Sequence, residues 1–164
     1  MIPKIENILF ATDFSENSRI SIDWAIALSQ KHGARLLVLH VLEDVAAIAP
    51  NIQMYFTDEE WEKMKERNEK DAVGKAKERL QSFCDEVQAC TTECEYVADE
   101  ILVRRGMPID EIIGAAEEHH CDIIVIGTAG GRKLTDIIMG STARGVLRRS
   151  AVPVLSIPMT EQKA

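Results

Sequence analysis

The stretch 35–42 is apolar at almost every position and does not alternate between apolar and polar residues. A strand of this kind is buried on both faces, which is typical of a central strand in a parallel sheet covered by helices. Helix-like stretches separate it from four similar runs, at residues 5–12, 100–104, 122–126 and 152–157. We therefore predict an α/β fold, a single doubly wound five-stranded parallel sheet with helices on both faces.

The first two predicted helices have recognisable end signals. Ser15 is suited to cap the first helix, and Gly33 is suited to end it. Thr57 and Glu60 fit a capping box at the start of a long charged helix that runs over about 58–87. The many Glu and Lys residues of this helix indicate a solvated face rather than a binding surface.

Two shorter helices are predicted nearer the C-terminus. One follows the turn at residues 106–108, and the other spans 143–149. The last strand, 152–157, contains Pro153, which cannot donate a hydrogen bond to a neighbouring strand. This strand is therefore expected at an edge of the sheet.

A glycine-bearing loop follows the fourth predicted strand. Gly127 and Gly130 stand before a spacer of nine residues, after which come Gly140, Ser141 and Thr142. Glycines let a backbone approach a ligand closely, and free N–H groups at a helix N-terminus attract anions. Ser141 and Thr142 add hydroxyl donors, and either is suited to cap the helix. The pattern fits a nucleotide phosphate site or, alternatively, a turn that needs glycine for its geometry only; it is neither a Walker A loop nor a dinucleotide fingerprint.

Two other segments should lie beside this loop. Ala11, Thr12 and Asp13 follow the first strand, and Val41 ends the second. Ligands of doubly wound sheets bind beyond the carboxyl ends of the strands, where the strand order reverses. The segments meet the glycine loop if the first and fourth strands are neighbours, which predicts the order 3-2-1-4-5. Asp13 also suits a turn or a helix cap, so a purely structural role is open for it.

Size and charge restrict the class of protein. The 164 residues suit one domain, 1–164, and the net charge of −8 argues against nucleic-acid binding. No apolar run approaches the roughly 18 residues that cross a membrane, and the N-terminus does not resemble a signal peptide. We therefore expect a cytoplasmic protein that does not associate with membranes.

The cysteines and histidines do not match known metal-site spacings. Cys84, Cys90 and Cys94 lack the Cys-x-x-Cys pattern, so free thiols are the simpler interpretation. The cluster 119–122 places two histidines, Cys121 and an aspartate in succession. Adjacent side chains point in different directions and rarely hold one ion together, so a metal site is not predicted here.

The chain resembles the universal stress protein family over nearly its whole length. The resemblance rests on the glycine motif and on residues 8–15, 37–41, 106–112, 121–128 and 150–155. It implies the five-stranded sheet in the order 3-2-1-4-5 and a homodimer. The family has a branch that binds ATP and a branch that does not, and the spacing of Gly127, Gly130, Gly140 and Ser141 is similar to that of the ATP-binding branch.

Carried over by position, the resemblance implies an ATP site. Ala11, Thr12 and Val41 would frame the adenine, and Asp13 would meet the ribose or a metal ion. Mg or Mn would be bound mainly through the phosphates. The phosphates themselves would be held by Gly127, Gly130, Gly140, Ser141 and Thr142.

The leading hypothesis is a stress-response protein that binds ATP as a switch or scaffold. No general base or arginine finger is evident, so any hydrolysis should be slow, and no catalytic residue is nominated. The alternative is a dimeric scaffold without nucleotide, which Ala129 favours because the ATP-binding branch often has His or Arg there. Arg132 or Lys133 is a candidate to replace that charge. An adenylate-transferring enzyme is a third possibility, for which the chain offers no second catalytic constellation.

The homodimer also has a physical argument. The edge strand 152–157 exposes unpaired backbone groups and apolar side chains. Pairing it with the same strand of a second copy about a two-fold axis would cover both.

Overall fold

The structure is a computed structural model that describes residues 2–43, 57–90, 97–128 and 139–158. The described elements alternate between strands and helices, as the sequence predicts. In chain order they are β1 (Asn7–Thr12), α1 (Glu16–His32), β2 (Arg35–Leu42), α3 (Asp58–Cys90), β3 (Glu100–Arg105), α4 (Pro108–Glu118), β4 (Ile123–Gly127), α5 (Ser141–Arg149) and β5 (Val154–Ile157).

The five strands form one parallel sheet in the order β3-β2-β1-β4-β5. Leu9 of β1 lies opposite Leu37 of β2 on one side and Ile124 of β4 on the other. The predicted fold class and strand order are therefore confirmed. The strand order reverses between β1 and β4, because the chain moves outward through β2 and β3 and then returns to the far side of β1.

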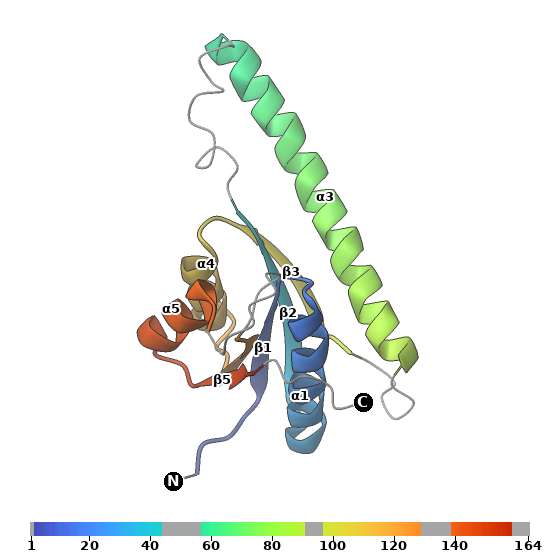
Figure 1. Cartoon of the computed structure of the whole chain (residues 1–164), viewed down its shortest axis with the longest axis vertical. Coiled ribbons are helices and arrows are strands. Elements are labelled where there is room, and N and C mark those ends of the chain that lie inside the picture. The colour runs from blue at the N-terminus through green and yellow to red at the C-terminus, as the bar shows by residue number, and fades with distance from the viewer. Residues whose placement is uncertain (1, 44–56, 91–96, 129–138, 159–164) are drawn as a thin grey trace.

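Helices cover both faces of the sheet (Figure 1), with α1 and α3 on one face and α4 and α5 on the other. Successive residues of a strand point to opposite faces. Ile8 and Phe10 therefore pack under α1 and α3, while Leu9 and Ala11 pack under α4 and α5. Both faces of β1 are closed, which explains why the central strands are apolar at consecutive positions.

The predicted signals at the helix ends are confirmed. Ser15 caps α1 by accepting a hydrogen bond from the Ser18 backbone N–H at 3.3 Å, and Gly33 ends α1 with a φ of 61°. At the start of α3, Glu60 Oε2 accepts from the Thr57 backbone N–H at 3.0 Å, and Thr57 Oγ1 accepts from the Glu60 N–H at 3.3 Å. This reciprocal pair is the predicted capping box.

The starts of two strands, β1 and β5, differ from the expectation. β1 begins at Asn7 rather than at residue 5, because its pairing with β2 begins where Asn7 lies opposite Arg35. β5 is at the sheet edge as predicted, but it begins at Val154, one residue after Pro153. Pro153 contributes through its carbonyl, which accepts a hydrogen bond from the Ile124 N–H at 2.9 Å.

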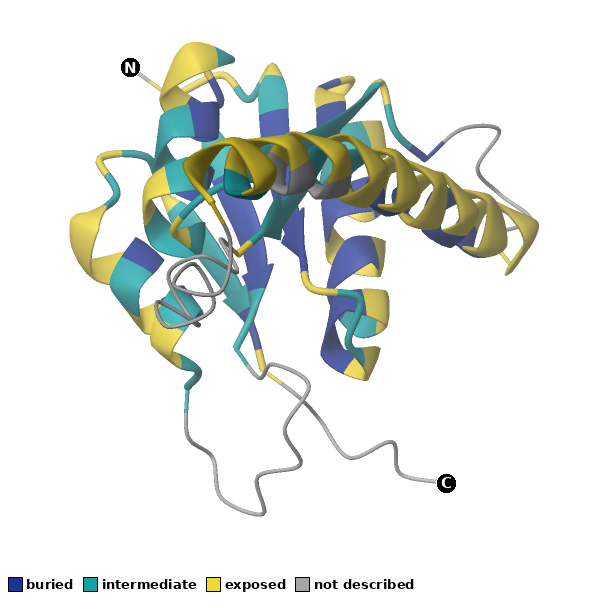
Figure 2. Cartoon of the chain, turned by 90° about the horizontal axis from the view of Figure 1, so that it is seen from above, coloured by how far each residue is buried: buried dark blue, intermediate teal, exposed yellow. Residues whose placement is uncertain are grey.

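Helix α3 has 33 residues, and the side chains that it buries against the sheet come from its C-terminal part. Ala76, Leu80, Phe83 and Val87 are buried, whereas the described side chains between residues 57 and 75 are exposed or half-buried. Figure 2 shows this exposed surface along the helix, and Figure 1 shows its first half extending past the sheet. The expected solvated face is confirmed. Even this helix lacks an apolar stretch that would cross a membrane, and so do the other described helices.

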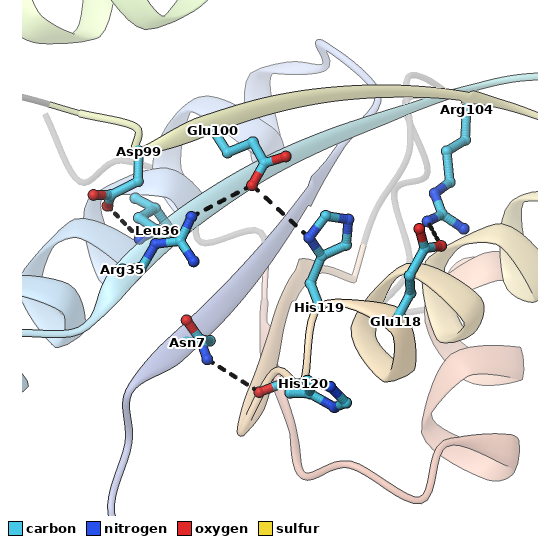
Figure 3. Close-up of polar contacts among 9 residues, drawn as sticks. All are labelled: Asn7, Arg35, Leu36, Asp99, Glu100, Arg104, Glu118, His119 and His120. Atoms are coloured by element: carbon cyan, nitrogen blue, oxygen red, sulfur yellow. Dashed lines mark hydrogen bonds and ion pairs between the residues drawn. The ribbon is translucent and has the colours of Figure 1, made fainter.

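Carboxylates join neighbouring strands at the amino ends of the sheet. Asp122 Oδ2, just before β4, accepts hydrogen bonds from the backbone N–H groups of Glu6 and Asn7 at 2.7 and 3.0 Å. Asp99 Oδ2, just before β3, accepts from the Leu36 N–H at 2.7 Å (Figure 3). These contacts fix the starts of β1 and β2 next to their neighbours.

The histidine cluster lies at this same end of the sheet. His119 Nδ1 is 3.8 Å from Glu100 Oε2, and the His120 carbonyl accepts from Asn7 Nδ2 at 3.3 Å (Figure 3). Among the residues that the structure describes, no three potential ligands are grouped as a metal ion would need.

Candidate functional site

A cavity of about 630 Å³ opens at the carboxyl ends of β1, β2 and β4. Asp99 and Asp122 lie at the opposite end of the sheet. Thr12, Val41 and Gly127, which lie at or near the carboxyl ends of these strands, all line the cavity. The cavity therefore lies where the strand order reverses, the place at which doubly wound sheets bind ligands.

The structure brings together most of the residues that the sequence nominates. Gly130 lies outside the described residues, as do Ala129, Arg132 and Lys133. The others all line the one cavity: Ala11, Thr12, Asp13, Val41, Gly127, Gly140, Ser141 and Thr142.

One wall of the cavity is apolar. It comprises side chains from three strands and from α4: Ala11, Leu39, Val41, Pro108, Ile112 and Ile126. The sequence predicts a helix after the turn at residues 106–108, but not that Pro108 and Ile112 line a cavity. Their part in the cavity depends on α4 packing over β2, which no local pattern reveals. The alternation along β2 was the available signal for Leu39, because it points to the same face as Val41.

Asp13 has a defined structural role as well as a place in the cavity. Its Oδ1 accepts hydrogen bonds from the Ser15 backbone N–H at 3.0 Å and from Ser18 Oγ at 2.8 Å. Ser15 is the N-cap of α1 and Ser18 lies in its first turn, so Asp13 fixes the connection between β1 and that helix. The turn role that the sequence left open is present, in a residue that also lines the cavity.

His40 is a cavity residue that the sequence did not nominate. Its Nδ1 lies 2.8 Å from the Thr12 carbonyl oxygen. A carbonyl oxygen can only accept, so Nδ1 carries the proton in this contact. Burial lowers the pKa of His40 below its ordinary value, which favours the neutral ring. The signal for this residue was its polarity within an otherwise apolar strand.

Phe14 contacts this imidazole with its ring. Its backbone has a φ of 62°, a left-handed conformation that is unusual for an aromatic residue. This conformation follows directly after Asp13 and directs the chain into the Ser15 cap of α1. The cavity edge and the start of α1 are thus formed by one short, tightly turned segment.

The N-terminus of α5 forms the polar end of the cavity. The helix begins at Ser141, two residues earlier than expected, and its N-cap is Gly140. The expectation that Ser141 or Thr142 caps the helix is therefore wrong, because both lie inside its first turn. Gly140 has no side chain with which to cap, so the N–H groups of that turn are left for solvent or a ligand. The residues of the turn line the cavity, and the helix dipole adds positive potential there.

Two of the predicted glycines differ in what they require. A Cβ at position 127 would lie 2.5 Å from Asn17 Nδ2 and 3.0 Å from Ser21 Oγ, both buried in α1. Gly127 is therefore needed for the packing of α1 on β4, whatever the cavity holds. Gly140 has φ −57° and ψ 155°, which other residues adopt without strain. Its N–H donates to the Thr128 carbonyl at 2.6 Å and ties α5 to the end of β4.

The charges around the cavity are mixed. Asp13 and Glu43 contribute carboxylates, and Arg144 contributes a guanidinium. A polyanionic ligand would meet the carboxylates unfavourably unless a cation or the α5 dipole offset them. The arrangement thus combines an apolar wall, a helix N-terminus and side chains of both charges.

The sequence model of the universal stress protein family matches residues 4–158 of the chain. A curated relative, universal stress protein MJ0577 from Methanocaldococcus jannaschii, is 26% identical over 153 residues, which are 93% of this chain and 94% of the relative. The solved structure of MJ0577 superposes with a TM-score of 0.76 and 22% identity, covering 98% of this chain and 100% of the other.

Two further solved structures share the fold and are described as nucleotide complexes. A universal stress protein from Archaeoglobus fulgidus in complex with dAMP has a TM-score of 0.59 and 24% identity, covering 96% of this chain and 99% of the other. A universal stress protein in complex with cAMP has a TM-score of 0.59 and 19% identity, covering 94% and 98%.

Proposed function

The chain belongs to the universal stress protein family, and we propose that its cavity binds ATP, with Mg or Mn, so that it acts as a nucleotide-dependent switch or scaffold in the cytoplasmic stress response. The observation that carries this proposal is the N-terminus of α5 opening into a cavity at the strand-order reversal. Its volume of about 630 Å³ suits a ligand of nucleotide size. The related proteins bound to dAMP and cAMP support an adenine nucleotide.

The cavity has a suitable partner for each part of ATP. The apolar wall around Val41 and Ile112 would take the adenine, and Asp13 would lie toward the ribose or a metal ion. The first turn of α5, with Gly140 and Ser141, would bind the phosphates, because its free N–H groups and dipole favour anions. Mg or Mn fits this set as a cation held mainly by phosphate oxygens and water. It would offset the repulsion between the phosphates and the carboxylates.

Any hydrolysis should be slow. Asp13 is the carboxylate we nominate to orient a metal ion or water, and its Oδ1 is already engaged by Ser15 and Ser18. These contacts hold the carboxylate in place and occupy its Oδ1 with two donors from the protein. We therefore assign no catalytic residue and propose binding, rather than turnover, as the activity of this site.

Calorimetric titration of nucleotide-free protein with ATP, with and without Mg²⁺, tests the proposal. We expect saturable binding near one ATP per chain and loss of that binding in Gly140→Val, whose side chain would block the first turn of α5. The backbone of Gly140 suits valine, so the variant should fold. Gly74→Val on α3, where nothing lies within 4 Å of an added Cβ, is the matched control. Normal ATP binding by Gly140→Val would contradict the site.

The second candidate function is a scaffold that does not bind nucleotide. Asp13 and Glu43 in the cavity wall favour it, because they lower the attraction for a polyanion. No heat and no thermal stabilisation at millimolar ATP with Mg²⁺ would select this function over the first.

We also propose a homodimer through the edge strand β5. Pro153 and Ile157 use their carbonyls toward β4, so the backbone groups of the alternate residues Val154 and Ser156 face outward. Ser156→Pro should prevent pairing with a second copy while leaving the β4 contacts in place. Light scattering at micromolar concentration should give twice the chain mass for the wild type and the chain mass for the variant. A wild type with the mass of one chain would overturn this proposal.

A further inference from the structure

Helix α5 carries three arginines that differ in their surroundings. Arg149 Nη2 lies 2.6 Å from Asp110 Oδ1 on α4, so its charge is engaged in an ion pair. Arg144 lines the cavity and forms no ion pair with any residue that the structure describes. Arg148 is exposed and is not part of the cavity lining. The guanidinium of Arg144 is therefore available to a ligand in the cavity. Arg148, on the same helix but outside the cavity, provides a control.

The position of Arg144 relates it to the first turn of α5. Its backbone N–H donates to the Gly140 carbonyl at 3.0 Å, which closes that turn. Side chains of a helix lean toward its N-terminus, which directs the long side chain of Arg144 toward the first turn and its N–H groups. An anion bound by those N–H groups would have Arg144 on its outer side.

Arg144 also stands out in the charge balance of the cavity. The ionisable residues in its described lining are Asp13, His40, Glu43 and Arg144. Two of these are acidic, and burial of His40 favours its neutral form. Arg144 is thus the permanent positive side-chain charge in the described lining, and a guanidinium binds phosphate oxygens in a bidentate manner.

We propose that Arg144 binds the outer phosphates of the nucleotide and makes the cavity favour a nucleoside triphosphate over a monophosphate. This inference rests on the proposed nucleotide binding. The first turn of α5 holds one phosphate through N–H groups that every adenine nucleotide can use. The second and third phosphates, which AMP lacks, reach the guanidinium.

The test compares the dissociation constants of ATP and AMP, both with Mg²⁺, for four proteins. Arg144→Gln should weaken ATP binding by about tenfold and AMP binding by less than about twofold, as expected for loss of a charge-assisted contact to the outer phosphates. Arg144→Lys should lie between, because it keeps the charge and loses the planar fork. Arg148→Gln should match the wild type. Arg144 is exposed, so melting temperatures should agree among the variants.

The other outcomes are distinguishable. Equal loss for ATP and AMP in Arg144→Gln, or no loss for either, would overturn the role of Arg144 in selection while leaving nucleotide binding intact. A wild type that binds AMP as tightly as ATP would do the same. A wild type that binds neither nucleotide would overturn this inference together with the proposed function.

Discussion

The imidazole of His40 lies against the ring of Phe14, with ring centroids 4.3 Å apart and an angle of 41° between the planes. The Arg79 guanidinium of α3 lies 4.5 Å from the centroid of the Phe14 ring, and the Phe83 ring packs edge-on against Phe14 with centroids 6.0 Å apart. The end of β2, the turn after β1 and the buried part of α3 are joined through this one aromatic ring. The contact also covers part of the His40 ring, which is half-buried.

The pH dependence of stability should reflect this burial. The pKa of His40 is lowered from its ordinary 6.5, mainly by burial. As the pH falls below 6.5, His40 therefore binds a proton in the unfolded chain more readily than in the folded chain. The free energy of unfolding should therefore be highest, with respect to His40, above about pH 6.5, and it should fall as the solution becomes more acidic. His40→Gln should lose less stability between pH 7 and pH 5 in urea unfolding, with exposed His32→Gln as the control. Parallel stability curves for wild type and His40→Gln would contradict the argument.

Gly127→Ala should destabilise the protein without any ligand present. The added methyl would meet Asn17 and Ser21 in α1, and overpacking of this kind costs about 1–3 kcal/mol. Gly74→Ala, where no atom lies within 4 Å, should instead gain about 0.5–1 kcal/mol from helix propensity. Denaturant unfolding of the two variants measures both signs. A neutral Gly127→Ala would show that α1 moves freely relative to β4.

Asp122→Ala should weaken the amino end of the sheet. It removes the acceptor for two backbone N–H groups, those of Glu6 and Asn7, and should cost about 1–3 kcal/mol. Asp110→Ala is the control, since it removes an exposed partner of Arg149 and should cost less than about 1 kcal/mol. Hydrogen exchange should also show faster exchange at the start of β1 in Asp122→Ala alone. Equal losses in the two variants would count against a special role for this carboxylate.

The three described cysteines should differ in reactivity. Burial raises the pKa of both Cys84 and Cys121 to about 11, so these thiols remain protonated near neutral pH. Cys90, at the end of α3, is exposed. Brief alkylation at pH 8 followed by peptide mapping should find Cys90 modified well before the other two, and addition of urea should remove the difference. Rapid labelling of Cys84 in the folded protein would show that α3 separates from the sheet.

The sequence predicts much of this fold because its signals are local. The apolar run 35–42, the Ser15 cap and the Thr57–Glu60 box each depend on neighbours in the chain, and each is found where expected. The strand order followed from requiring that three loops meet, which is a condition on the whole sheet. The start of α5 was placed too late because glycine as an N-cap leaves no side-chain signal, and the hydroxyls of Ser141 and Thr142 suggested a cap instead.

The parts that could not be predicted depend on contacts between distant segments. Ile112 enters the cavity only because α4 packs over β2, and Gly127 is needed because Asn17 lies above it. Arg144 belongs to no recognisable motif, and its place in the cavity depends on how α5 packs beside β1 and β4. For Asp13 the two interpretations were not exclusive, since its Oδ1 accepts hydrogen bonds from Ser15 and Ser18 in the turn before α1, and the same residue lines the cavity.

The long helix α3 affects how this molecule moves through water. Its 33 residues form a rod roughly 50 Å in length, and its N-terminal portion extends past the body of the sheet (Figure 1). A particle with such a projection meets more friction than a sphere of the same mass. A single 18.3 kDa chain should therefore tumble slowly and leave a sizing column early. A small elution volume would then reflect the elongated shape of the molecule, and a direct measurement of mass would give the number of chains.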